Sequence, residues 1–153
     1  MRCPYCQNEE TRVIDKRDHD SVSRRRRECL KCGKRFTTYE RIELDLWVSK
    51  KNDKREEFSR EKLRKGVLKA LEKRQFEEEE QEAIIDRIES RIYTFAKDKD
   101  VTSKKIGELV MAELKKVDKI AYLRFVAVYR EIDSIEEFEE ELNKLGKKSG
   151  KKC

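Results

Sequence analysis

The sequence predicts an α+β protein in which a small β-rich, metal-binding module precedes a mainly helical domain with a short β-hairpin. Three observations predict this class. Two Cys-x-x-Cys pairs lie within the first 32 residues. Short runs of β-branched and aromatic residues occur between residues 12 and 58, as is typical of strands. Beyond residue 58, apolar residues recur at helical spacing as far as residue 145.

The first element is a candidate metal site formed by Cys3, Cys6, Cys29 and Cys32. Each pair lets two thiolates reach one ion from a tight turn, and two such turns supply the four sulfurs that structural zinc prefers. The 22 residues between Cys6 and Cys29 leave room for the two arms of a zinc ribbon. We therefore expect one structural Zn²⁺ per chain, with unrelated buried cysteines or a redox pair as alternatives. His19, between the pairs, is expected at the surface.

Strands are predicted at residues 12–15 and 36–40. The aliphatic residues Leu44, Leu46 and Val48 then alternate with Asp45, Trp47 and Ser49, a period of two. The Asn-Asp pair at 52–53 is a turn signal, so residues 46–58 are predicted to form a small hairpin. Gly33 follows the second cysteine pair and can adopt the positive φ that such a turn often needs. We expect Phe36, Tyr39 and Trp47 to pack under the sheet, with stacking on bases as the alternative.

Five helices are predicted after residue 58. Capping residues at Ser59, Thr102 or Ser103, Asp118 and Ser134 mark four helix starts, and the acidic run at 77–80 marks another. The apolar stripes are expected to face the core. Their members are Leu63, Val67 and Leu71; Ile84, Ile88, Ile92 and Phe95; Ile106, Leu109, Val110 and Val117; Ile120, Leu123, Val126 and Ala127; and Ile135, Phe138, Leu142 and Leu145.

The charge is unevenly distributed along the chain, whose formal net charge is +6. Residues 1–46 carry a net charge of +3 and residues 47–146 a net charge of −1, while residues 147–153 contain four lysines and no acid. We expect these three segments to be the metal module, the helical domain and a disordered basic tail in which Cys153 is an incidental thiol.

Several protein classes are excluded by what the sequence lacks. It contains no run of about 18 apolar residues and no secretory signal, so we expect a cytoplasmic protein with no membrane partner. It also contains no Gly-x-x-x-x-Gly-Lys-Ser/Thr motif, which excludes a P-loop NTPase at the motif level. Any phosphate must therefore be held by side chains and a helix end.

A run of four arginines directly precedes the second cysteine pair. Alternate residues of a strand face opposite ways, so two of these arginines should project on each side. Guanidinium groups match phosphate oxygens and guanine edges, so a rigid basic module favours nucleic acid over a merely solvated strand. The residues expected at this interface are Arg17, Arg24, Arg25, Arg26, Arg27, Lys34 and Arg35.

The predicted hairpin is basic and leads into a helix N-terminus, whose free N–H groups suit anions. Lys50, Lys51 and Lys62 can gather around one triphosphate, and Glu56 can accept hydrogen bonds from a base or a sugar. From the residues alone, a solvated lysine-rich hairpin is the alternative.

Over residues 1–146 the chain resembles the bacterial ribonucleotide reductase transcriptional repressor family, NrdR. The matching stretches are CPYC at 3–6, VID at 13–15, RRRRECLKC at 24–32, KRFTTYE at 34–40, FSREKL at 58–63, ALEKR at 70–74 and AYLRFVAVYR at 121–130. The resemblance implies a zinc ribbon that binds double-stranded operator DNA and an ATP-cone that binds ATP or dATP. It further implies a non-enzymatic repressor, active when dATP is abundant, whose homo-oligomeric state depends on the nucleotide.

The resemblance also implies a nucleotide site. In ATP-cones an apolar strand residue, two basic residues, a turn, an acidic residue and a lysine on the first helix form this site. The corresponding residues are Val48, Lys50, Lys51, Glu56 and Lys62, with Ser103 and Tyr129 as further pocket members. The chain departs from the family in a slightly shorter loop at 18–23 and in carrying Glu57 where many members have proline.

Two other functions are considered. A zinc-ribbon accessory protein that binds RNA or polymerase would ignore nucleotides, so nucleotide binding separates it from the repressor. An ATPase or nucleotide hydrolase is disfavoured, because the chain has one histidine, a closed metal site and no recognisable pair of catalytic carboxylates.

Overall fold

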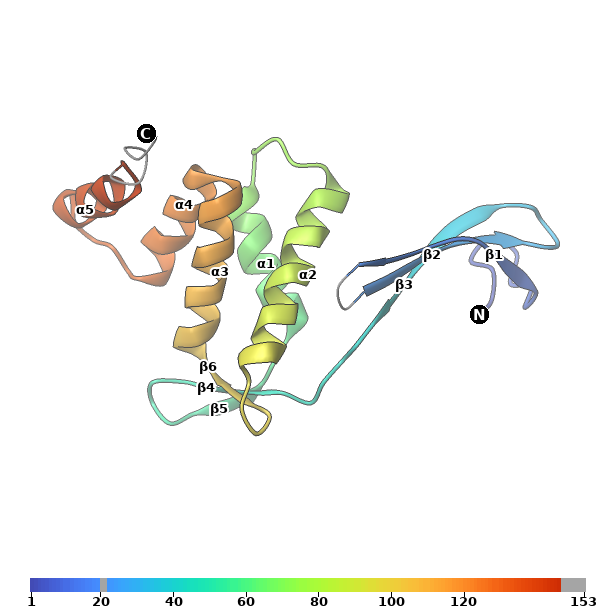
Figure 1. Cartoon of the computed structure of the whole chain (residues 1–153), viewed down its shortest axis with the longest axis horizontal. Coiled ribbons are helices and arrows are strands. Elements are labelled where there is room, and N and C mark those ends of the chain that lie inside the picture. The colour runs from blue at the N-terminus through green and yellow to red at the C-terminus, as the bar shows by residue number, and fades with distance from the viewer. Residues whose placement is uncertain (20–21, 147–153) are drawn as a thin grey trace, which may run out of the picture. The chain divides into compact units, whose positions relative to one another are not determined.

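The computed structural model describes residues 1–19 and 22–146, and its architecture confirms the α+β class (Figure 1). The chain divides into two compact units, Met1–Leu44 and a second unit that begins at Asp45. We predicted this boundary two residues later, after residue 46. The predictions for residues 147–153, including the one for Cys153, lie outside the described residues.

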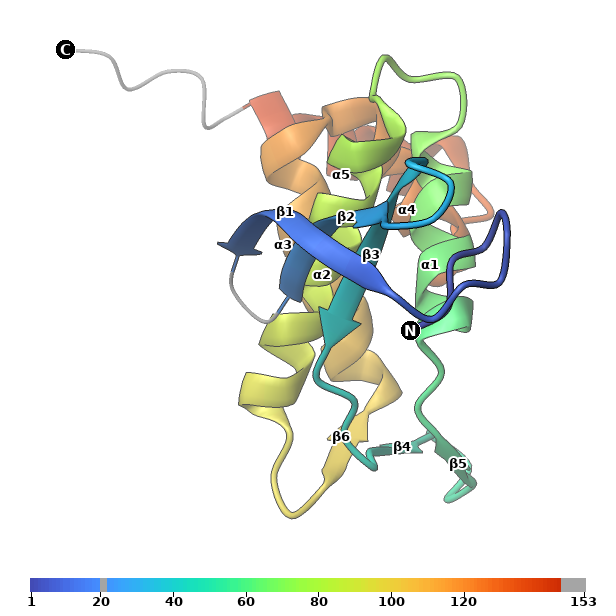
Figure 2. The ribbon, with the colours of Figure 1, turned by 90° about the vertical axis from the view of Figure 1, so that its right-hand side faces the viewer.

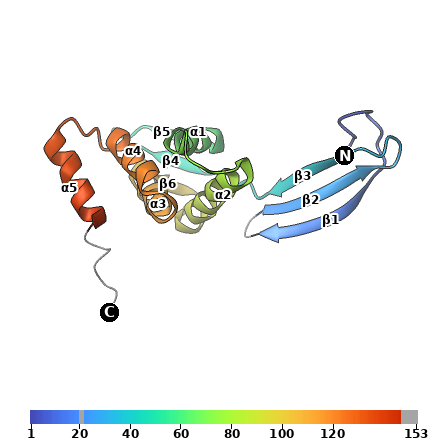
Figure 3. The same ribbon diagram turned by 90° about the horizontal axis from the view of Figure 1, so that it is seen from above.

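The first unit contains a three-stranded antiparallel sheet in the order β1-β2-β3 (Figure 3). The strands are β1 (Thr11–His19), β2 (Val22–Cys29) and β3 (Arg35–Arg41). β1 and β3 are longer than predicted, because the charged residues at their ends give no hydrophobic alternation. A register shift between Val13 and Asp15 adds one residue to β1, as in a β-bulge.

The first unit has almost no hydrophobic core. Among its described residues, Cys3 and Cys29 are the only hydrophobic residues that are buried. Tyr39 is 47% exposed, so the expectation that it packs under the sheet is wrong, whereas Phe36 is half-buried. A module this poor in apolar contacts needs another source of stability, such as a metal.

The second unit opens with the predicted hairpin. Its strands are β4 (Trp47–Ser49) and β5 (Arg55–Glu57), and β6 (Asp100–Thr102) pairs with β4 in parallel. The resulting sheet, in the order β5-β4-β6, lies at one end of the helices (Figure 2). β6 was not predicted, because a three-residue strand with one apolar residue, Val101, shows no periodicity. Trp47 is 41% exposed beside Arg55, so its expected burial is also wrong.

The five predicted helices are present. They are α1 (Arg60–Leu71), α2 (Glu78–Phe95), α3 (Ser103–Val117), α4 (Lys119–Tyr129) and α5 (Ile135–Gly146). The side chains of Ser59, Thr102, Asp118 and Ser134 each accept a hydrogen bond from a backbone N–H three residues later. Glu77 and Glu80 form a capping box at the start of α2. None of the described helices is both long enough and apolar enough to cross a membrane.

Helices α1 to α4 supply most of the core, and α5 contacts α4. Most predicted stripe residues are buried or half-buried, including Val67, Ile88 and Val126. Four predicted stripe residues are instead exposed. They are Phe95 (46%), Ile120 (45%), Ile135 (74%) and Leu142 (43%). The first two lie at helix ends, where packing stops, and the last two lie on α5, which has one main helical neighbour.

An ion cluster joins α1 to α2. The guanidinium of Arg60 lies 2.7 Å from Asp86, 2.9 Å from Glu89 and 3.2 Å from Glu82. Burial lowers the pKa of Arg60, but its hydrogen bonds to these three carboxylates outweigh burial and raise that pKa above its usual value. The cluster therefore fixes the first turn of α1, the turn that follows the hairpin.

Candidate metal centre, basic face and lysine-flanked cavity

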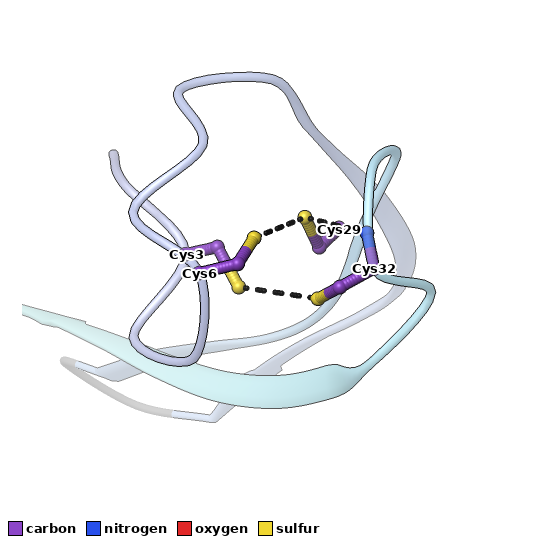
Figure 4. A group of neighbouring side chains, drawn as sticks. All are labelled: Cys3, Cys6, Cys29 and Cys32. Carbon is purple, nitrogen blue, oxygen red and sulfur yellow. Dashed lines mark hydrogen bonds between the residues drawn. The ribbon is translucent and has the colours of Figure 1, made fainter.

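The four predicted metal ligands come together at one end of the first unit (Figure 4). Their sulfur atoms all lie within 4.8 Å of one another. The Sγ atoms of Cys3 and Cys32 are 3.7 Å apart, and those of Cys6 and Cys29 are 3.6 Å apart. Four sulfurs at ~2.3 Å from a central zinc are separated by about 3.8 Å in a tetrahedron. The thiol positions therefore fit a tetrahedral zinc ion.

The two cysteine turns have the same backbone structure. In each, the N–H of the residue after the second cysteine donates to the carbonyl of the first: Gln7 to Cys3 at 2.9 Å and Gly33 to Cys29 at 3.0 Å. Both donor residues, Gln7 and Gly33, have positive φ, 61° and 68° respectively. Gly33 thus has the predicted conformation, and Gln7 adopts it despite its side chain. Two matching turns present two sulfurs each.

The electrostatics of the cluster favour a bound cation. The backbone amides of Cys32 and Lys31 lower the pKa of the Cys29 thiol to about 6, against the opposing effect of burial. The backbone of Asn8 lowers the pKa of Cys6, but burial and the three neighbouring thiols raise it to about 11. Four thiolates at this separation repel one another, so a cation allows all of them to ionise.

The register of the first sheet assigns its basic residues to two faces. Residues directly opposite each other share a face, as Arg17, Arg24 and Tyr39 do. Arg24 and Arg26 therefore lie on one face of β2, and Arg25 and Arg27 lie on the other. The face that contains Arg24 also carries Arg12, Arg17, Arg26, Arg35 and Arg41, together with the acids Asp15 and Glu28. We call it the arginine face.

The second face carries less excess positive charge. Among the described residues, its basic side chains are Lys16, Arg25 and Arg27, and Arg25 pairs with Glu40 at 2.7 Å. On the arginine face, Glu28 pairs with two arginines, at 2.6 and 2.9 Å. Lys34 lies outside the strands, with its ammonium 4.9 Å from the centre of the Tyr5 ring. The predicted nucleic-acid residues are thus divided between two faces and a turn.

In the second unit, Glu56 links two of the predicted phosphate-binding lysines. Its Oε2 atom lies 3.0 Å from the Nζ of Lys50 and 3.3 Å from the Nζ of Lys62. Hydrogen bonds from Lys50 and Lys62 hold the pKa of Glu56 below its usual range. Lys51 lies in the exposed turn between the strands. The hairpin and the first turn of α1 therefore meet through one carboxylate and two ammonium groups.

A cavity of about 210 Å³ lies beside this cluster. Four predicted nucleotide residues line it: Val48, Glu56, Lys62 and Tyr129. Lys50 does not line the cavity but contacts Glu56, which does. Lys51 and Ser103 do not line it either. Further lining residues that the sequence did not single out are Phe58, Gly66, Gly107 and Phe125. Gly66 and Gly107 are isolated glycines inside two predicted helices. A glycine in that position often marks close packing against a neighbouring group, so this was the signal in the sequence that could have identified them.

Two helices have their N-termini next to the sheet that borders this cavity. α1 follows β5 and α3 follows β6, so their first turns lie at the same end of the unit. A helix N-terminus carries a partial positive charge and free N–H groups. With the lysines, these two ends make this part of the unit suited to an anion.

Tyr129 closes the cavity against α3. Its ring stacks on Phe125, with the ring centres 5.7 Å apart, and its hydroxyl donates to the carbonyls of Ser103 (3.4 Å) and Lys104 (3.3 Å). A Cβ added to Gly107 would lie 2.2 Å from the Tyr129 ring. Only glycine at 107 allows the ring to lie this close to α3.

Gly107→Ala is accordingly expected to lower the free energy of unfolding by ~1–3 kcal/mol, the usual cost of overpacking. The matched control is Gly66→Ala, whose added Cβ would lie 4.0 Å from Phe125 and should stabilise α1 by roughly 0.5–1 kcal/mol. Urea unfolding followed by circular dichroism measures both changes. Equal stability of the two variants would contradict the assigned packing of Tyr129.

Both units match known families. A family model described as the N-terminal domain of transcriptional repressor NrdR-like proteins matches residues 1–40, and one described as the ATP cone domain matches residues 46–135. Three relatives named transcriptional repressor NrdR are similar along nearly their whole length. The relative from Acetivibrio thermocellus is 53% identical over 95% of this chain and 97% of its own. Those from Caldicellulosiruptor saccharolyticus and Ruthia magnifica are 49% and 50% identical over 95% of this chain and 96% and 99% of theirs.

Proposed function

Because the chain belongs to the NrdR family of transcriptional repressors, we propose that it represses ribonucleotide reductase genes by binding operator DNA under the control of ATP and dATP. The observation that carries this proposal is the joining, in one chain, of a four-cysteine basic module to a unit with a lysine-flanked cavity. It acts as a cytoplasmic regulator, associated with the nucleoid when bound to DNA, and not as an enzyme.

Zinc has a structural role in this proposal. One Zn²⁺ per chain is held by Cys3, Cys6, Cys29 and Cys32, and it supplies the stability that the sparse core of the first unit does not. A rigid ribbon holds its arginines in fixed positions, so less conformational entropy is lost when they contact DNA.

The arginine face is the proposed DNA-binding surface. Its six arginines outnumber its two acids, and phosphate neutralisation dominates the affinity of proteins for DNA. Tyr39 is exposed on this face with Arg41 5.0 Å from its ring centre, which allows it to pack against a sugar or a base. Arg25 and Arg27, on the other face, and Lys34 then contribute at the edges of the interface.

The nucleotide is proposed to bind at the cavity beside Glu56. Its phosphates replace the Glu56 carboxylate as the partner of Lys50 and Lys62, with Lys51 adding charge from the turn. Glu56, released from the lysines, accepts hydrogen bonds from the nucleoside. Tyr129 lines the same space, and its hydroxyl donates to the backbone carbonyl of Ser103, which ties α4 to α3.

Nucleotide and DNA binding are coupled through the assembly of several chains. Such coupling requires dATP to favour the DNA-competent homo-oligomer more than ATP does. A single small module buries little surface on DNA, so joined copies gain affinity by binding paired sites together.

Two double variants test the proposed DNA-binding face. Arg24→Ala/Arg26→Ala should weaken operator binding and reduce the slope of log affinity against log salt by about 1–2, because up to two phosphate contacts are lost. Arg25→Ala/Arg27→Ala, the matched control from the other face, should change the slope less. Fluorescence anisotropy with labelled operator DNA at several salt concentrations provides the measurement. A larger loss of operator affinity in Arg25→Ala/Arg27→Ala than in Arg24→Ala/Arg26→Ala would assign the DNA interface to the opposite face of the sheet.

A further inference from the structure

Helix α5 leaves part of its apolar stripe uncovered. Leu145 is buried, but Ile135 is 74% exposed and Leu142 is 43% exposed. With Glu139, these two exposed residues follow i, i+4, i+7 spacing, so they lie on one side of the helix. A neighbouring side is already occupied, since Glu141 is buried against α4.

The contact between α5 and α4 is well defined. The Glu141 carboxylate accepts a hydrogen bond from the hydroxyl of Tyr122 at 3.1 Å and pairs with Arg130 and with Lys144. Burial raises the pKa of this carboxyl, but Lys144, Arg130 and Tyr122 outweigh it and hold the pKa below its usual range. The position of α5 is therefore fixed while its Ile135–Leu142 side remains exposed.

A groove of about 620 Å³ runs between α1 and α4. Its apolar lining includes Ala70, Phe125, Ala127 and Val128, and Val128 is 73% exposed. Three cationic side chains, those of Lys69, Lys73 and Arg124, also line it, together with one acid, Glu72. The Arg124 guanidinium donates to the backbone carbonyls of Ala70 and Glu72, so Lys69 and Lys73 are the cations that remain available. The groove is thus an open apolar channel with a basic border, of the kind that accepts an amphipathic helix.

The charges of this groove and of α5 are complementary. The exposed part of α5 carries Glu136, Glu139 and Glu140, none of which has an ion pair within the described chain. Lys69 and Lys73 likewise have no carboxylate partner among the residues that the structure describes. An acidic helix with an exposed apolar stripe and a basic apolar groove occur on the same unit, each without a partner.

We propose that the exposed side of α5 docks into the α1–α4 groove of a second copy of this chain. Ile135 and Leu142 enter the apolar channel, and the surrounding glutamates meet Lys69 and Lys73 of the second copy. When both copies exchange this contact, the pair is closed by a two-fold axis. The inference rests on the proposed function, because it assigns the surface through which copies of the repressor assemble.

The groove is also adjacent to the proposed nucleotide site. Gly66, Phe125 and Tyr129 line both the groove and the 210 Å³ cavity. A nucleotide that moves the stacked rings of Phe125 and Tyr129 therefore changes the shape of the groove. This shared wall gives a physical route from nucleotide binding to self-association.

Charge reversal on each side tests the contact. Lys69→Glu/Lys73→Glu makes the groove acidic, and Glu136→Lys/Glu139→Lys makes α5 basic. Each variant alone should self-associate at least about tenfold more weakly than the wild type, because like charges then face each other. An equimolar mixture should recover association, since each helix again meets a groove of opposite charge. Sedimentation of labelled full-length chains with ATP, with dATP and without nucleotide measures this recovery.

The recovery in the mixture separates a contact from a folding defect, because two misfolded variants cannot restore each other. Failure of the mixture to recover, unchanged association of either variant, or a wild-type chain that is monomeric in all three conditions overturns the inference. Binding of a different protein or of a small molecule in the groove would give the first of these results. Nucleotide and operator binding by each variant are measured in parallel, so that a failed interface is distinguished from a failed repressor function.

Discussion

Cys29→Ala is expected to release zinc, unfold the first unit and abolish operator binding, while the helical unit keeps its fold. Loss of one thiolate leaves three ligands for zinc, and structural zinc contributes about 10–16 kcal/mol to the folding of small modules. The first unit has no other described buried hydrophobic residue apart from Cys3 to replace this contribution. The core of the second unit lies beyond Asp45 and contains none of the ligands.

Three measurements check this result. A chromogenic chelator quantifies zinc, circular dichroism follows the helices, and anisotropy reports operator binding. Cys153→Ala is the matched control, because it removes a cysteine that is not one of the four predicted ligands and should retain zinc. Stoichiometric zinc and normal operator affinity in Cys29→Ala would contradict the assignment of the metal centre.

Lys62→Ala is expected to weaken ATP and dATP binding by about tenfold or more, because a charge-assisted hydrogen bond to phosphate is worth roughly 1.5–3 kcal/mol. Lys62 lies in the first turn of α1, and its ammonium contacts Glu56 beside the cavity. The fold should be unaffected, since this side chain is 69% exposed.

Lys65→Ala provides the control from the same helix. Its side chain is 75% exposed and its ammonium lies 4.0 Å from Glu61, so its removal should leave nucleotide affinity unchanged. Isothermal titration calorimetry with ATP and with dATP compares the two variants. Equal affinities in Lys62→Ala, Lys65→Ala and the wild type would exclude the lysine-flanked cavity as the phosphate site.

Features that depend on local sequence could be predicted well. A short turn sets the geometry within each cysteine pair, and the helix starts follow from capping side chains such as Ser59 and Asp118. The five helices and the hairpin were predicted for the same reason, because each shows its own periodicity and end signals within one continuous segment, and the α+β class follows from their order.

Features that depend on distant contacts could not be predicted. β6 pairs with β4 across some fifty residues and contains a single apolar residue, Val101. The exposure of Ile135 and Leu142 depends on how much of α5 its one main neighbour covers. The role of Gly107 depends on a ring from another helix, and helical periodicity cannot identify such a contact.

The central claim is that the adenine nucleotide determines operator binding through the assembly of chains. The most direct test measures operator affinity of the zinc-loaded, full-length protein with ATP, with dATP and without nucleotide, while light scattering records the mass of the assembly in each sample. The account predicts the tightest operator binding with dATP, together with a mass that differs from that in ATP. Equal operator affinity in all three conditions would contradict it.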